Sequence, residues 1–351
     1  MKFHPCPGYS LSRLASLFLF GTSLFFLASP HLSRAQNTLY AQGRAAFDTQ
    51  KWEEAARLMS EAEATAPAST DALLFEGKSL LHLNHLQEAE SVLTTYAKRH
   101  PDSAAALYTL AMVQQRENKP RESLTTLTSA AKLRAPTSDE LRIAGLDYVL
   151  LNDYPDAIHW LEKAAELDPK NAEVWYSLGR CDYAQSRFHD AQRAFEKALA
   201  LNPSNMKAAE NLALVYSAEN RLADADRSFQ QSIALAKKDP STDEWPYLDY
   251  GGFLIDQDRA SEAIPLLEQA VVLNSKCAAC HEKLGRALIT SDHLQEGIRQ
   301  LEQAVALDAK DAHLHYELGL AYRKAGILDR AKEELALSEK LYGTKAEGER
   351  K

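Results

Sequence analysis

Residues 172–203 read AEVWYSLGRCDYAQSRFHDAQRAFEKALALNP, and this stretch decides the fold. Gly179 and Ala191 are small, Phe195 is large, and Pro203 closes the stretch. Two antiparallel helices approach each other closely only where side chains are small, and a large residue nearby then fills the gap between layers. Proline stops the second helix because it cannot continue the backbone hydrogen bonding. The stretch therefore predicts one pair of packed helices.

The same pattern recurs along the chain with a period of 34 residues. Small residues hold the place of Gly179 at Gly43, Gly77, Ala111, Gly145 and Ala213 and, after an insertion of four residues, at Gly251, Gly285 and Gly319. Large apolar residues hold the place of Phe195 at Met59, Leu93, Leu127, Leu161, Phe229, Leu267, Leu301 and Leu335. One helix pair cannot bury its apolar face alone, so it stacks on the next pair. The period therefore predicts a stacked array instead of two or three closed globular domains.

The period also predicts where the chain divides. Nine blocks begin near Gln36, Thr70, Ala104, Ser138, Ala172, Met206, Glu244, Ala278 and Ala312. We expect six repeats over residues 36–237, an inter-repeat insertion over residues 238–243 and three repeats over residues 244–342. The last helix, about Asp329 to Tyr342, is expected to cap the array, because its exposed side is charged. Residues 343–351 are expected to form a polar, disordered tail.

The N-terminal segment reads as a secretory signal. Lys2 and Arg13 form a basic region, and the apolar run of residues 14–27 is too short for a comfortable membrane span. Ser33-Arg34-Ala35 places small residues at the −3 and −1 positions of a cut after its last residue. The sequence therefore predicts a signal peptide over residues 1–35 and an exported protein, periplasmic or extracellular, with no membrane span in the mature chain. An uncleaved N-terminal anchor is the alternative.

Composition argues against several classes of function. The 351 residues include 40 basic and 49 acidic ones, for a net charge of −9. Residues 1–35 hold three basic residues and no acidic one, so the mature chain would keep 37 basic and 49 acidic residues, a net charge of −12. This balance argues against nucleic-acid binding. The sequence also lacks a phosphate-cradling glycine loop and the G-x-S-x-G and H-E-x-x-H motifs, so we expect no enzyme activity, no metal and no cofactor.

Between residues 36 and 342 the blocks resemble the tetratricopeptide repeat (TPR) family. The fullest match lies in the stretch quoted above, at Trp175, Leu178, Gly179, Ala191, Phe195, Ala198 and Pro203. The resemblance implies an all-α, right-handed α-solenoid of about nine helix-turn-helix repeats. It also implies that the first helix of each pair lines a concave groove that binds a protein or an extended peptide. The chain is therefore expected to be an exported scaffold within a cell-envelope assembly.

The resemblance places basic and aromatic residues in this groove. They are Tyr40, Arg44, Lys78, Tyr108, Arg116, Arg142, Tyr176, Arg180, Tyr183, Arg286, Tyr316 and Arg323. With Lys324, eight basic residues occupy groove places, against four acidic ones, Asp48, Glu210, Asp256 and Glu282. Arginine and tyrosine are enriched at binding hot spots. We therefore expect an acidic partner with apolar or aromatic anchors; the alternative is that these residues only solubilise the array and complete its packing.

Cys277-Ala278-Ala279-Cys280-His281 is a motif with chemistry of its own. Its spacing matches covalent c-type haem attachment, with His281 as an iron ligand. The repeat instead predicts a packing role for His281, because Trp175 holds the same place. A two-residue spacer at a helix N-terminus favours a reactive thiol and permits ring closure, so Cys277 and Cys280 are also candidates for a disulfide or redox pair, or for two unremarkable cysteines. A thiol-redox or c-type haem protein on the same repeats is the alternative function.

Overall fold

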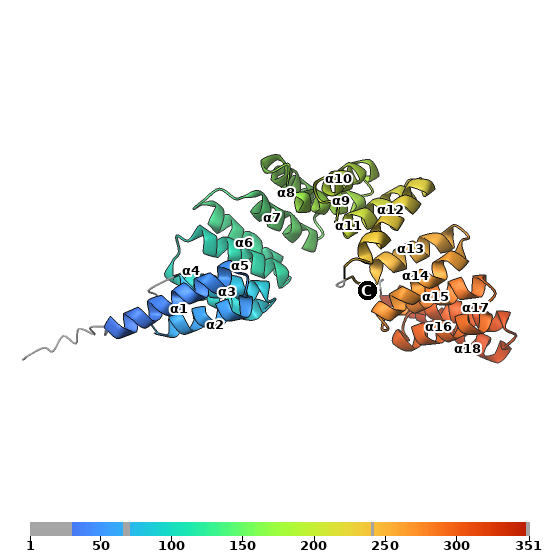
Figure 1. Ribbon diagram of the computed structural model, residues 1–351. Coiled ribbons are helices and arrows are strands. Elements are labelled where there is room, and N and C mark those ends of the chain that lie inside the picture. Colours follow the sequence, from blue (N-terminus) through green and yellow to red (C-terminus); the bar gives the residue numbers. More distant parts are fainter. Residues whose placement is uncertain (1–29, 66–70, 240–241, 349–351) are drawn as a thin grey trace, which may run out of the picture. The chain divides into compact units, whose positions relative to one another are not determined.

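A computed structural model describes residues 30–65, 71–239 and 242–348. These ranges contain 18 α-helices and no strand, which confirms the all-α prediction (Figure 1). In chain order the helices are α1 (Pro30–Asp48), α2 (Trp52–Thr65), α3 (Ala72–His82), α4 (Leu86–Arg99), α5 (Ala104–Arg116), α6 (Pro120–Ala131), α7 (Ser138–Leu150), α8 (Tyr154–Leu167), α9 (Ala172–Ala184), α10 (Phe188–Leu201), α11 (Met206–Ala218), α12 (Leu222–Ala236), α13 (Trp245–Asp256), α14 (Ala260–Leu273), α15 (Ala278–Thr290), α16 (Leu294–Leu307), α17 (Ala312–Lys324) and α18 (Leu328–Gly348).

The helix bounds follow the predicted period. Six first helices, α5, α7, α9, α11, α15 and α17, begin at the residue where the period starts a block. The helix α13 begins at Trp245, one residue late, and the predicted start at Thr70 lies outside the described residues. In the second unit each first helix from α5 to α17 packs on the second helix of its own repeat, and α1 packs on α2 in the first unit. Every odd-numbered helix is therefore a first helix and every even-numbered one a second helix.

Both ends of the array differ from the expected bounds. The helix α1 starts at Pro30, so it runs through the predicted cleavage site after residue 35, while most of the predicted signal peptide lies outside the described residues. The expected end of the last helix at Tyr342 is wrong, because α18 continues to Gly348. A single glycine such as Gly343 costs a helix only about 1 kcal/mol, and no proline follows it. None of the described helices is long and apolar enough to span a bilayer.

The chain divides into two compact units, residues 1–88 and residues 89–351. In the first unit, buried side chains of α1, α2 and α3 pack around Met59 and Leu58. In the second unit, one hydrophobic cluster contains Phe229 of α12 and both Tyr250 and Phe253 of α13. The core of this unit therefore continues from the sixth repeat into the seventh, on either side of the insertion.

Small and large residues meet as the period predicts. A Cβ atom added to Gly179 would lie 2.7 Å from Cε1 of Phe195, and one added to Gly145 would lie 2.7 Å from Cγ of Leu161. Such a distance is shorter than a van der Waals contact, so a larger residue would push the two helices of a repeat apart. The glycines thus set the close spacing inside these helix pairs.

A second periodic feature lies in the turn between the two helices of each repeat. One residue there has a positive φ, at Gln50, Asn84, Asn118, Asn152, Ser186, Asn220, Asp258, Asp292 and Gly326. The left-handed conformation disfavours most side chains and is easiest for glycine and asparagine. Four of the nine residues are asparagine and one is glycine, which are the residue types that adopt this backbone conformation most easily.

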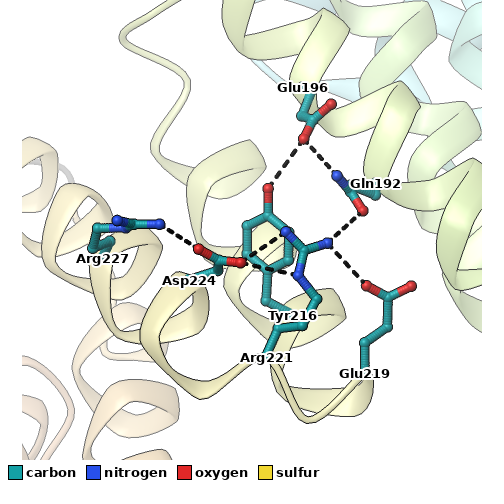
Figure 2. A network of polar contacts seen from close by, with 7 residues as sticks. All are labelled: Gln192, Glu196, Tyr216, Glu219, Arg221, Asp224 and Arg227. Atoms are coloured by element: carbon teal, nitrogen blue, oxygen red, sulfur yellow. Dashed lines mark hydrogen bonds and ion pairs between the residues drawn. The ribbon is translucent and has the colours of Figure 1, made fainter.

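Polar contacts join consecutive repeats beside these turns. The guanidinium of Arg221 donates to Asp224 in its own repeat and to Gln192 in the preceding one, and it stacks over the ring of Tyr216, 4.3 Å from its centroid. Tyr216 in turn donates its hydroxyl hydrogen to Glu196 of the preceding repeat at 3.0 Å. Figure 2 shows Arg221 at the centre of this network. The turns are therefore tied to the second helix of the repeat before them.

Candidate binding surface and cysteine pair

In the first unit, three predicted groove residues gather around one aromatic ring that the sequence analysis did not single out, Phe75. The guanidinium carbon of Arg44 lies 3.9 Å from its centroid, Nζ of Lys78 lies 5.4 Å away, and the Tyr40 ring meets it edge-on at 6.5 Å. Arg44 also pairs with Asp48 at 3.6 Å. Burial, and then the charge of Arg44, lowers the pKa of Lys78. Arg44 and Lys78 therefore already make contacts inside the first unit, with Phe75 and, for Arg44, with Asp48.

In the second unit, Tyr108 does not lie on the surface. Its side chain is 4% exposed, and its hydroxyl donates to the carbonyl oxygen of Arg134 at 2.7 Å. The guanidinium of Arg134 covers the ring at 4.5 Å from the centroid. The prediction that Tyr108 contacts a ligand is therefore corrected: this tyrosine is a core residue.

Burial at the place of Tyr108 differs between repeats. The equivalent residues Glu210, Leu248 and Glu282 are also less than one-tenth exposed, whereas Arg142 and Tyr176 at the same place are partly exposed. From α5 to α15 each first helix contacts the next one, so a neighbouring first helix lies beside this side of the helix before it. Tyr316 holds the same place on α17, the last first helix among the described residues, and it is 44% exposed.

The predicted residues that remain accessible near the middle of the second unit lie on α5, α7 and α9. Arg116 and Arg180 are exposed, and the side chain of Arg142 is 25% exposed and lies 3.8 Å from Asp139. The guanidinium of Arg180 lies 5.9 Å from the centroid of Tyr176. Tyr183 is half-buried, with its ring 5.8 Å from that of Phe188. We call these five residues, Arg116, Arg142, Tyr176, Arg180 and Tyr183, the basic–aromatic face.

Two carboxyl groups interrupt the basic residues on the next first helices. Glu210 of α11 and Asp249 of α13 interact directly. Burial raises the pKa of Glu210 to about 8, and the charge of Asp249 adds to this effect. Burial also raises the pKa of Asp249, and the positive charge of Lys283 on α15, in the following repeat, lowers it in part. Asp249 does not hold a groove place that the family resemblance marks, so the sequence alone did not point to it.

The C-terminal candidates are divided between paired and open positions. Arg286 pairs with Glu282 at 3.3 Å, and His313 lies 3.9 Å from the same carboxylate. Arg323 is exposed near the end of α17. The basic–aromatic face on α5, α7 and α9 is therefore the larger group of accessible predicted residues in the second unit.

Cys277 and Cys280 form a disulfide with their Cα atoms 5.3 Å apart. Cys277 is the N-cap of α15 and is half-buried, whereas Cys280 lies in the first turn and is fully buried. Nδ1 of His281 lies 2.6 Å from Oε1 of Gln300, and its Nε2 lies 3.2 Å from the carbonyl oxygen of Ser275.

His281 is a packing residue, as the repeat predicts. It is 8% exposed, and Trp175 at the same place donates from Nε1 to the carbonyl oxygen of Pro169 at 3.0 Å. Both ring nitrogens of His281 are engaged and both neighbouring sulfurs are bonded to each other, so this arrangement does not fit haem attachment.

Helix pairs that recur with a period of 34 residues and stack on their neighbours define a helical repeat protein, a class that offers extended surfaces for binding. Family models described as tetratricopeptide repeat match residues 40–104, 76–139, 172–205, 208–242 and 282–342, and a TPR repeat model matches residues 145–180. The chain belongs to the tetratricopeptide repeat family. No curated protein matches it.

Solved structures show the same fold. A tetratricopeptide repeat protein from Parabacteroides merdae is 16% identical, with a TM-score of 0.57 over 73% of this chain and 99% of that one. A chain of the APC/C hetero-tetramer Cut9–Hcn1 is 15% identical, with a TM-score of 0.55 over 92% of this chain and 76% of that one. PilW, described as a widely conserved type IV pilus biogenesis factor, is 19% identical, with a TM-score of 0.51 over 56% of this chain and 90% of that one. At these identities the likeness establishes the fold.

Proposed function

We propose that this protein is an exported, non-catalytic scaffold that binds a protein or an extended peptide on the basic–aromatic face, within a cell-envelope assembly. The observation that carries the proposal is the arrangement of Arg180 and Tyr183 on α9, accessible beside Tyr176 and next in the array to Arg142 on α7. Arginine and tyrosine supply charge and rigid contact area at binding hot spots. The partner is an acidic segment with apolar or aromatic anchors.

The structural relatives support a role in assembly. Cut9 forms a hetero-tetramer with Hcn1, and PilW is a pilus biogenesis factor. A pull-down from a cell-envelope extract, with the folded protein as bait, identifies the partner. Its affinity is then measured at two salt concentrations, and higher salt is expected to weaken binding because it screens the charges.

Charge reversal on the basic–aromatic face tests the site. We expect the variant Arg142→Glu/Arg180→Glu to lose more than about 2 kcal/mol of binding free energy, because repulsion replaces attraction. The matched control is Arg193→Glu/Arg227→Glu on the second helices α10 and α12, where the side chains are 68% and 76% exposed. Equal losses in both variants would indicate a nonspecific effect of net charge, and unchanged affinity in the first would place the site elsewhere.

Export has a separate test. Mass spectrometry of the protein recovered from the cell envelope or the medium is expected to show an N-terminus at Gln36. Recovery of the intact segment of residues 1–35 would favour an uncleaved anchor. Protein found only inside the cytoplasm would contradict export.

A further inference from the structure

We propose that the Cys277–Cys280 disulfide is a thiol–disulfide exchange site, in which Cys277 is the sulfur that a substrate thiolate attacks. The substrate class is an accessible thiol, on a small molecule or on a protein. The proposal concerns α15 and its cap, and it does not depend on what the basic–aromatic face binds.

The two cysteine residues differ in their exposure to solvent. Cys280 is 0% exposed and belongs to the main hydrophobic cluster of the second unit, together with Leu284 of the next helical turn. Cys277 packs at the margin of that cluster and is only half-buried. Exchange requires the attacking thiolate to reach one sulfur of the bond, and only Cys277 offers that access.

The position of Cys277 suits a thiolate once the bond is reduced. Its Sγ accepts a hydrogen bond from the backbone N–H of Cys280 at 3.0 Å, as an N-cap side chain does. In other repeats the same place carries an oxygen cap, from Ser103, Thr137, Asn171, Asn205 and Asp311. The cap in the last repeat, Asp311, carries a carboxylate, so this place accepts a negative charge. The positive end of the α15 dipole would stabilise a Cys277 thiolate in the same way.

Structural stabilisation is a poor explanation for this bridge. Its cysteines are three residues apart, so it closes one of the smallest loops a disulfide can close and removes little chain entropy from the unfolded state. Helix α15 also does not need the bond for capping, because Cys277 would still accept from the backbone after reduction. A reducible bond can therefore open here without loss of the helix start.

A substrate thiolate attacks Sγ of Cys277, the Cys277–Cys280 bond breaks, and Cys280 leaves as a thiolate that takes up a proton. A second substrate thiolate then attacks the substrate sulfur of the mixed disulfide and releases the Cys277 thiolate. Two substrate thiols lose two electrons and two protons and become one disulfide, while the two cysteines become a dithiol.

Glutathione serves as the probe, in the full chain with Cys6→Ser to remove the cysteine outside the described residues. Cys280→Ser leaves Cys277 as a single thiol, and Cys277→Ser leaves Cys280 with a serine that can still cap α15. With oxidised glutathione at pH 7, we expect Cys277 to form the mixed disulfide at least about tenfold faster than Cys280, as measured by mass spectrometry. Cys181 is an internal control, because burial raises the pKa of its thiol to about 11.

The protein with both cysteines provides a second readout that needs no variant at either position. In buffers of reduced and oxidised glutathione, the native protein is expected to pass between bridge and dithiol with its circular dichroism unchanged. Resistance of the native bridge to reduced glutathione would overturn the proposal, and so would equal rates at Cys277 and Cys280.

Discussion

Lys119 donates a hydrogen bond from Nζ to Oε2 of Glu90 at 2.6 Å, and the two residues belong to consecutive repeats. Arg221 and Arg259 hold the same place as Lys119 in later repeats, and they reach Gln192 and Asp226 at 2.9 and 3.0 Å. The contact therefore recurs between one turn and the second helix of the repeat before it.

This contact is expected to couple neighbouring repeats modestly. Replacing Lys119 with methionine should lower the free energy of unfolding by about 0.5–1 kcal/mol, the range of a partly exposed ion pair. Its side chain is 40% exposed and that of Glu90 is 26% exposed, so salt should reduce the effect. A double-mutant cycle with Glu90→Gln in urea measures the coupling, with Lys132→Met as the control. A coupling energy of zero at low salt would contradict the prediction.

Ser186 adopts a positive φ of 56° in its turn, where four other repeats have asparagine. Ser186→Gly is expected to raise the free energy of unfolding by about 1 kcal/mol, because glycine adopts this conformation without a steric penalty. Asn220→Gly, in the equivalent turn, should change stability less, since asparagine already tolerates the left-handed region. Thermal unfolding measures the change in stability of each variant relative to the unmodified protein. A destabilised Ser186→Gly protein would be evidence against conformational strain at this place.

Asp147 is fully buried in α7, and burial raises its pKa to about 7, although the Ser123 hydroxyl lowers it in part. The folded protein then holds a proton that the unfolded chain releases above about pH 4, so the free energy of unfolding falls as pH rises from about 4 to about 7. Asp147→Asn should therefore stabilise the protein by more than about 1 kcal/mol at pH 8 and have little effect at pH 4.

Urea unfolding at the two pH values measures this difference. Asp153→Asn is unsuitable as a control because Asp153 caps α8, whereas Asp156→Asn changes an exposed carboxyl in the same repeat. An equal gain at pH 4 and pH 8 would show that the aspartate destabilises through packing and not through its charge.

The insertion after α12 is expected to be the first site of proteolysis between residues 36 and 342. A cavity of about 560 Å³ lies beside it, lined in part by Lys237, Asp239 and Thr242, so packing around this connection is incomplete. Limited trypsin digestion should cut after Lys237 or Lys238 first, because both are exposed and the described residues between Lys238 and Trp245 are not helical. First cuts inside the earlier repeats, residues 36–236, would contradict a weak joint at this place.

The sequence predicted the fold well because its decisive contacts are local and periodic. Gly179 and Phe195 are 16 residues apart and meet inside one repeat, so their sizes alone reveal the packing. Tyr108 was misjudged because its burial depends on how the next repeat covers it, which spacing inside one repeat does not reveal. Phe75 and Asp249 were missed for a related reason: each acts through residues of another helix, at places that the family pattern does not mark as ligand-facing.

Tyr316 on α17 is 44% exposed, whereas Tyr108, Glu210, Leu248 and Glu282 at the same place in earlier repeats are buried. The hydrogen bonds of Lys119 and Arg221 run from one turn to the second helix of the adjacent repeat. Each block therefore depends on contacts with the block beside it. Tandem duplication of one block in the gene would lengthen the array by one whole repeat, but it would also replace the partners at the new junction: a copy of the block that contains Lys119 would place this lysine beside Leu124 in place of Glu90. A gain of one repeat is thus expected to require compensating substitutions at the junction.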